Sequence, residues 1–312
     1  MIVSASYKTD IPAFYAEWFL NRLDAGFART VNPYSRRIQT VPLTRDSVDG
    51  FVFWTRNVGP FFGTLDEVRR RGFPFVVQYT ITAYPRALDR ATIPAEQAID
   101  HLHRLNKTFG NAVSVWRYDP VVMTSLTPPD WHVTAFSRLC SAIAGAVDEV
   151  VLSFAHVYRK TARNLNAAAR LNGFQWLDPS PPEKVALLSR LAAVAAESGL
   201  KASLCGQPDL LASRLADGSA TGLSEARCID AGRLGRAAGD GTGAIQATRK
   251  PHRARCGCFS SRDIGEYDTC PHGCVYCYAV NSRNRAKEIF ARHCTGDEGL
   301  IIGSDRAIRR SF

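Results

Sequence analysis

The sequence lacks any long hydrophobic run and any secretory leader pattern. Its best apolar stretches, such as residues 73–79, have the length of a strand and fall far short of the ~18 residues that a membrane span needs. Residues 1–10 show neither the basic start nor the long apolar stretch of a signal peptide. These absences argue against membrane insertion and secretion, so we expect a cytoplasmic protein without a membrane partner.

Acidic residues are also in short supply. The chain has 29 Asp and Glu against 39 Lys and Arg, which gives a formal net charge of +10. Such an excess can favour nucleic acid, although widely spread basic residues are equally typical of a solvated surface. One local concentration precedes the cysteine-rich segment and can face nucleic acid or an anionic small substrate; it comprises Arg249, Lys250, His252, Arg253 and Arg255.

Cysteines are numerous but unevenly placed. Four of the nine, Cys140, Cys205, Cys228 and Cys294, are scattered along the chain and are predicted to be incidental thiols. The other five fall within residues 256–277. In a chain without a secretion signal, clustered cysteines indicate metal binding rather than disulfides.

The first two thirds of the chain alternate short apolar runs with amphipathic stretches. The runs are apolar at most positions, which is typical of parallel strands covered on both faces. We expect strands at residues 2–6, 50–54, 75–80, 113–117, 149–154 and 200–205, and helices at 10–25, 95–108, 134–146, 160–171 and 182–198. This alternation predicts an α/β fold, with a complete or partial parallel (β/α) barrel favoured over an open doubly wound sheet.

Composition changes after about residue 215. We therefore divide the chain into a barrel-like domain at 1–215, a Gly/Ala-rich loop at 216–250, and a cysteine-rich cluster-binding segment at 251–312 packed on the barrel. Within the loop, Gly239, Gly241 and Gly243 alternate with other residues, and a short strand is expected around 226–229. A further helix is expected at 281–294.

The central motif is a C-x3-C-x2-C spacing formed by Cys270, Cys274 and Cys277. Pro271 and Gly273 favour the turn that lets the three thiolates converge. Three thiolates bind only three irons of a 4Fe–4S cube and leave the fourth iron open for an exogenous ligand, as in catalytic rather than structural metal sites.

The aromatic residue Tyr276 before the third cysteine makes the motif resemble the signature of the radical S-adenosylmethionine superfamily, in particular the branch that includes spore photoproduct lyase. More closely, the chain resembles the DUF1848 family. The stretches that carry this second resemblance are residues 53–57 (FWTRN), 78–82 (QYTIT), 116–120 (WRYDP), 153–154 (SF) and 256–277.

The resemblance implies a barrel-like enzyme with a 4Fe–4S cluster at one mouth and S-adenosylmethionine chelated to the open iron. It also implies a one-electron donor such as flavodoxin or ferredoxin, whose electron drives cleavage of a carbon–sulfur bond to a carbon radical. The chain departs from the superfamily in two respects. The triad lies near residue 270 instead of after the first strand, and no Gly-Gly-Glu-like stretch follows the second strand.

Other site residues are expected at the ends of the parallel strands, where such folds build their sites. We predict catalytic roles for Arg117, Asp119 and Asn57. Arg117 can bind a carboxylate in bidentate fashion or pair internally with Asp119. Cofactor binding is predicted for Tyr276, Arg56, Gln78, Thr80 and Ser153.

Cys256 and Cys258 leave three roles open: a fourth cluster ligand, a second metal site, or a redox-active thiol pair. Two other classes of protein also stay open. One is a non-catalytic iron–sulfur electron carrier or redox sensor, and the other is a zinc-binding protein that interacts with nucleic acid.

Overall fold

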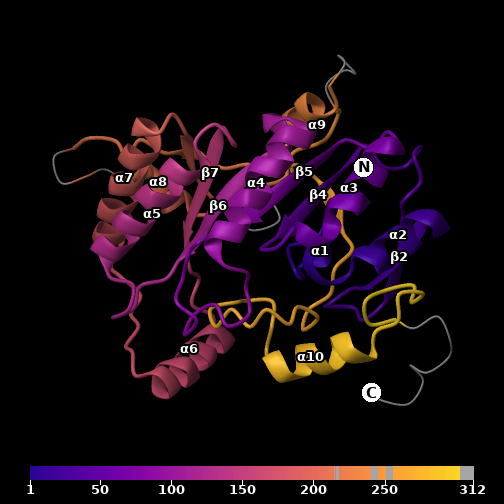
Figure 1. The fold of residues 1–312 in the computed structure, drawn as a ribbon. Helices are drawn as coiled ribbons and strands as arrows, with labels where there is room; N and C mark the ends of the chain where they lie inside the picture. Colours follow the sequence, from indigo (N-terminus) through magenta and orange to yellow (C-terminus); the bar gives the residue numbers. More distant parts are fainter. Residues whose placement is uncertain (214, 216–217, 240–244, 251–255, 303–312) are drawn as a thin grey trace.

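The structure is a computed structural model, and it describes residues 1–213, 215, 218–239, 245–250 and 256–302. Figure 1 shows a large sheet with helices packed around it and the last helix, α10, on the side of the strand ends. Five residues named above lie outside the described residues: Gly241, Gly243, His252, Arg253 and Arg255.

The main sheet has eight strands in the order β10-β1-β4-β5-β6-β7-β8-β9, and all neighbours are parallel. The parallel α/β architecture is therefore confirmed. The two edge strands, β9 and β10, have no ladder between them in the described residues, although the Phe259 amide donates to the Ile229 carbonyl at 3.0 Å. The strands are β1 (Ile2–Ala5), β4 (Gly50–Thr55), β5 (Phe75–Thr80), β6 (Ser114–Val121), β7 (Glu149–Phe154), β8 (Lys201–Leu204), β9 (Ser224–Glu225) and β10 (Ser261–Asp263).

Helices α1 to α9 occupy the connections between strands, and α10 follows the last strand. They are α1 (Ile11–Phe14), α2 (Ala16–Ala25), α3 (Phe62–Arg70), α4 (Ala95–Phe109), α5 (Pro129–Ile143), α6 (Arg159–Asn172), α7 (Pro181–Glu197), α8 (Pro208–Ala212), α9 (Ala231–Ala237) and α10 (Arg283–Arg292). Short 3-10 turns lie at Gly59–Phe61 and Asn111–Val113. The start of α7 follows directly from sequence, because Ser180 and Glu183 form a reciprocal capping box.

Three features differ from the expected elements. The helix predicted over 10–25 breaks at Tyr15 into α1 and α2, because Asp10 caps a separate first turn. An antiparallel hairpin of β2 (Phe27–Val31) and β3 (Ile38–Pro42), which the apolar pattern did not indicate, follows α2. The predicted strand near 226–229 is reduced to a two-residue β9 at Ser224–Glu225.

Both faces of the sheet are buried. Alternate strand residues pack on one face into the core beneath the helices, as Val3, Phe53 and Val77 do. Their neighbours point to the other face, where an inner cluster is formed by Ile2, Val52, Val76, Val115 and Val151, together with Ala226, Cys228, Ile229, Ala231, Leu234 and Cys258. Burial on both faces explains why the strands read as nearly continuous apolar runs.

The segment 264–282 runs across the carboxyl ends of several strands. The Ile264 amide extends the β10–β1 pairing by donating to Ser4, and the Tyr15 hydroxyl donates to the Thr269 carbonyl at 2.6 Å. Figure 1 places this segment between the sheet and the helices α6 and α10, on the side opposite α9.

Among the described helices, none combines the length and the apolarity needed to cross a bilayer.

Candidate functional site

The three motif cysteines lie together in the segment 264–282, and each is half-buried. Cys274 forms an isolated bridge with Asp89, and the Cys277 amide donates to the Cys274 carbonyl at 3.1 Å. Gly273 has φ of +79°, and a Cβ there would meet the Arg283 side chain at 2.5 Å. A side chain at this position would therefore disturb the turn between the first two cysteines.

Burial raises the pKa of all three thiols, because desolvation disfavours the thiolate. The charges of Asp10 and Cys277 raise the pKa of Cys270 further. The charges of Asp89, Cys277 and Cys270 raise the pKa of Cys274 further. The charge of Cys277 thus acts on Cys270 and Cys274, and that of Cys270 acts on Cys274, so the three thiols lie near one another. Without a cation the site favours neutral thiols, and a bound metal would reverse that preference.

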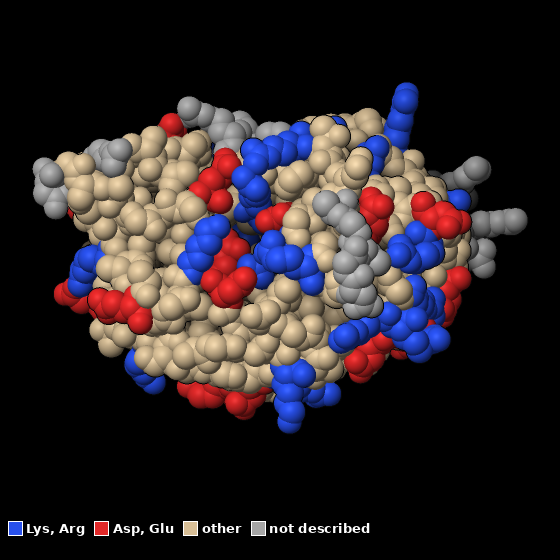
Figure 2. Space-filling model, turned by 90° about the horizontal axis from the view of Figure 1, so that it is seen from above, with Lys and Arg blue, Asp and Glu red and all other residues tan. Residues whose placement is uncertain are grey.

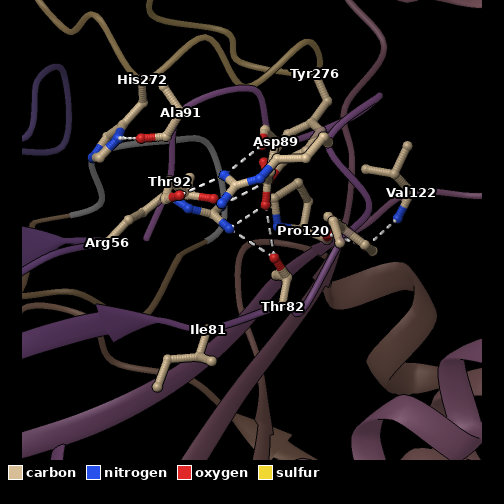
Figure 3. A network of polar contacts seen from close by, with 12 residues as sticks. Arg56, Ile81, Thr82, Asp89, Ala91, Thr92, Pro120, Val122, His272 and Tyr276 are labelled. Carbon is tan, nitrogen blue, oxygen red and sulfur yellow. Dashed lines mark hydrogen bonds and ion pairs between the residues drawn. The ribbon is translucent and has the colours of Figure 1, made fainter. Parts of the chain in front are cut away.

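Arg56 is the centre of a buried polar network beside Cys274 (Figure 3). Its guanidinium forms an ion pair with Asp89 and donates to Tyr276 Oη and Thr82 Oγ1, both at 2.7 Å. Tyr276 in turn donates to Asp89 Oδ1 at 2.7 Å. The positive charge of Arg56 lowers the pKa of the Cys274 thiol and so offsets part of the burial effect. Two predicted cofactor-binding residues, Arg56 and Tyr276, are thus brought together next to a motif cysteine.

A second carboxylate, Asp10, ties the motif to the strand ends. Its side chain accepts from the Arg56 amide at 2.7 Å and lies 2.8 Å from His272 Nε2. It also caps α1 by accepting from the Ala13 amide. The other His272 nitrogen lies 3.4 Å from the Ala91 carbonyl oxygen, so both ring nitrogens have protein partners.

The remaining predicted residues form a separate group at the end of β6. Arg117 is buried, pairs with Asp119, and donates to Gln78 Oε1 at 3.1 Å. Ser153 donates to the same Asp119 carboxylate. The Arg117 guanidinium also lies 4.8 Å from the Trp54 ring centroid. The internal ion pair that the sequence left open is therefore present, and it holds Arg117 in place.

Asn57 and Thr80 are placed differently. Asn57 Oδ1 accepts from the Gly59 amide at 3.0 Å, and the Asn57 amide donates to Thr55 Oγ1. This geometry is an Asx turn that leads into the 3-10 turn at Gly59–Phe61, whose N-cap residue is Val58. Thr80 is half-buried at the last position of β5, in register with Arg117.

Cys258 does not join the motif cysteines in their core cluster. Cys274 packs against the cluster that contains Leu88, Val275 and Tyr276, whereas Cys258 belongs to the inner cluster with Cys228. Cys256 is half-buried at the margin of that inner cluster. Within the described residues, no group of three or more His, Cys, Asp or Glu side chains is arranged to hold a metal ion.

The sequence did not single out several charged residues of this edge. Lys8 is buried, donates to the Gly265 carbonyl at 3.1 Å, and lies 3.6 Å from Asp263, which also accepts from Ser4 and Ser6. Lys8 follows the first strand, at the edge where polar site residues were expected, so its position in the sequence could have identified it. The sequence position of Asp89 could not, because only the fold brings its loop to Arg56.

A family model matches residues 2–279 of the chain, and its description is a domain of unknown function, DUF1848. The chain belongs to the DUF1848 family. This match includes every strand of the sheet, the Arg56 network and the three motif cysteines of this DUF1848 protein. No curated protein and no solved structure matches the chain.

Proposed function

We propose that this DUF1848 protein is a radical S-adenosylmethionine-type enzyme whose 4Fe–4S cluster is held by Cys270, Cys274 and Cys277. The observation that carries the proposal is the position of these three cysteines in one loop at the carboxyl ends of parallel strands, where the charge of Cys277 raises the pKa of Cys270 and the charges of Cys270 and Cys277 raise the pKa of Cys274. Sites in parallel α/β folds are built at this edge.

We also propose that the sheet curls into an incomplete barrel, because the strands follow chain order and β10 returns beside β1.

The donor set suits a cluster better than a single ion. Ligands of one tetrahedral ion converge on a common point, whereas ligands of a cube bind different irons and stand further apart. The loop supplies three cysteines, whereas a structural zinc site is usually closed by four protein ligands. When bound, such a cluster supplies the single electron that breaks a carbon–sulfur bond of S-adenosylmethionine.

The neighbouring residues would orient and shield this site. Arg56 places a fixed positive charge beside Cys274, and Asp89 and Tyr276 hold the guanidinium there. Asp10 fixes His272 inside the motif loop. The Arg117, Asp119 and Ser153 group, at the ends of β6 and β7, is our candidate for contacts with the cofactor or the substrate. Among the proposed site residues, Asn57 is held in a local turn, because its side chain accepts from the Gly59 amide.

The proposal requires a one-electron donor, and the surface around the motif favours an acidic one. Helix α6 carries Arg159, Lys160, Arg163 and Arg170 with no acidic residue, and α10 carries four basic residues against Glu288 alone. The Arg163 guanidinium donates to the Asn281 carbonyl at 2.6 Å, which fixes α6 against the motif segment. By contrast, the face seen from above mixes acidic and basic side chains (Figure 2). Flavodoxin and ferredoxin are small acidic carriers of the required kind.

Anaerobic reconstitution followed by electron paramagnetic resonance tests the proposal. We expect a reduced cluster whose spectrum shifts when S-adenosylmethionine is added, because the open iron gains a ligand. An unchanged spectrum would favour the non-catalytic carrier. A colourless protein that contains zinc would favour the zinc-binding nucleic-acid class.

A further inference from the structure

A second set of thiols meets at the inner cluster, which does not contain the motif cysteines. Cys205 directly follows β8, Cys228 follows β9, and Cys258 precedes β10. The Sγ atoms of Cys205 and Cys228 are 3.3 Å apart, which is within contact distance of two sulfurs. The Cys228 thiol also hydrogen-bonds to Cys258. Three residues treated as unrelated in sequence are thus neighbours in the fold.

A fixed cation accompanies this thiol group. Arg117 Nη1 lies 2.9 Å from Cys228 Sγ, and the Gln78 side chain donates to the Cys228 carbonyl at 2.9 Å. These contacts hold Cys228 in one position, and the positive charge of Arg117 offsets part of the effect by which burial raises the pKa of Cys228. Cys228 is 4% exposed, whereas Cys205 is half-buried, so a small oxidant reaches Cys205 first.

The two sulfurs are close to bonding geometry. A disulfide needs an S–S separation of about 2.05 Å, so the sulfurs at 3.3 Å must approach by roughly 1.3 Å. Side-chain rotation at Cys205 can supply much of this movement, because Cys205 lies in the loop that follows β8. Both cysteines are free thiols in the structure.

We propose that Cys205 and Cys228 are a redox-active dithiol that hydrogen peroxide converts into a disulfide. The Cys205 sulfur attacks one peroxide oxygen, the O–O bond breaks, and the products are a sulfenic acid and water. The Cys228 thiolate then attacks the Cys205 sulfur and displaces the hydroxyl as a second water. The two thiols lose two electrons and two protons in total, and peroxide accepts both.

Oxidation would alter the neighbouring polar group as well as the sheet edge. The bond would tie the end of β8 to the segment after β9, where the sheet has its shortest strand. It would also replace the thiol acceptor of Arg117 by a disulfide sulfur, which is a weaker acceptor. Arg117 pairs with Asp119, so the redox state of the dithiol would reach the proposed cofactor contacts. This dithiol does not depend on the proposed cluster function.

Peptide mapping of the full-length protein tests the proposal. Protein purified without oxygen is treated with hydrogen peroxide, the remaining thiols are alkylated, and disulfide-linked peptides are identified by mass spectrometry. We expect a Cys205–Cys228 linked pair that dithiothreitol reverses. The Cys205→Ser variant should lose this pair, whereas Cys140→Ser, at a buried cysteine outside the inner cluster, should retain it.

The wild-type map is decisive even if a variant fails to fold. The proposal is overturned if Cys205 and Cys228 stay alkylatable under conditions that oxidise the exposed Cys294. It is equally overturned if Cys228 links to Cys258 and leaves Cys205 reduced.

Discussion

The two thiol groups of this protein differ in how the chain assembles them. Cys270, Cys274 and Cys277 come from one short loop and lie among charged groups, with Asp10, Asp89 and Arg56 close by. Cys205, Cys228 and Cys258 come from three separate stretches and lie against an apolar inner cluster. The first setting suits a charged cofactor at the strand ends, and the second suits chemistry between the sulfurs themselves. Local spacing reveals only the first group.

The largest expected effect is on iron loading, which should depend on the motif cysteines and not on the second thiol group. Cys274→Ala should abolish cluster loading, because two thiolates cannot replace the missing ligand of the third iron. Cys228→Ala should load iron as the wild type does, since Cys228 lies in the inner cluster. Iron and sulfide analysis after anaerobic reconstitution measures both. Equal loading of Cys274→Ala and the wild type would contradict the assignment of the motif.

The charged surroundings of the motif should also matter for folding. Asp89→Asn removes the partner of Arg56, and the Asp89 side chain is only 2% exposed. Breaking a buried ion pair leaves an uncompensated charge, so we expect a loss of about 3–5 kcal/mol in the free energy of unfolding. The matched control is Asp130→Asn at the exposed pair with Arg190, which should cost less than about 1 kcal/mol. The free energy of unfolding of both variants is measured by urea titration. Equal losses in the two variants would show that the Arg56 network does not stabilise the fold.

A smaller effect concerns the surface that covers the motif. Replacing Arg285 and Lys287 of α10 by Glu should slow reduction by a flavodoxin about tenfold or more at low salt, because electrostatic steering is reversed. Reduction by dithionite, which needs no docking surface, should change little. The control changes Arg236 and Lys201 to Glu, on α9 and at the start of β8, at the opposite edge of the sheet. If both double variants slow the flavodoxin equally, α10 is not the docking face.

The last expected effect is the pH dependence of disulfide formation in the second thiol group. The hydrogen bond to Cys205 lowers the pKa of Cys228, but the hydrogen bond to Cys258 and burial outweigh it and raise the pKa to about 12. The pKa of Cys205 is raised as well, by its hydrogen bond to Cys228 and by burial. Both groups are protonated at neutral pH, so disulfide formation should be slow there and should accelerate about tenfold per pH unit up to pH 9. A rate of cross-linking that does not change with pH would argue against thiolate attack.

Sequence patterns predicted the parts of this protein that depend on residues close together in the sequence. The strands at 75–80 and 149–154 appear at the predicted positions, because residues buried on both faces must be apolar throughout. Arg56 follows β4 and Arg117 lies on β6, and each lies in a polar network. The contact of Cys205 with Cys228 and the pairing of Arg56 with Asp89 could not be predicted, because they join segments whose proximity depends on the strand order.

The most direct test of the central claim is mass analysis of S-adenosylmethionine after its incubation with the reconstituted, reduced protein. We predict that the wild type holds about four irons and four sulfides per chain, as a 4Fe–4S cluster requires, and that it cleaves the cofactor at a carbon–sulfur bond. The cleavage should disappear in Cys270→Ala. Intact S-adenosylmethionine after reduction of a fully loaded cluster would contradict the account.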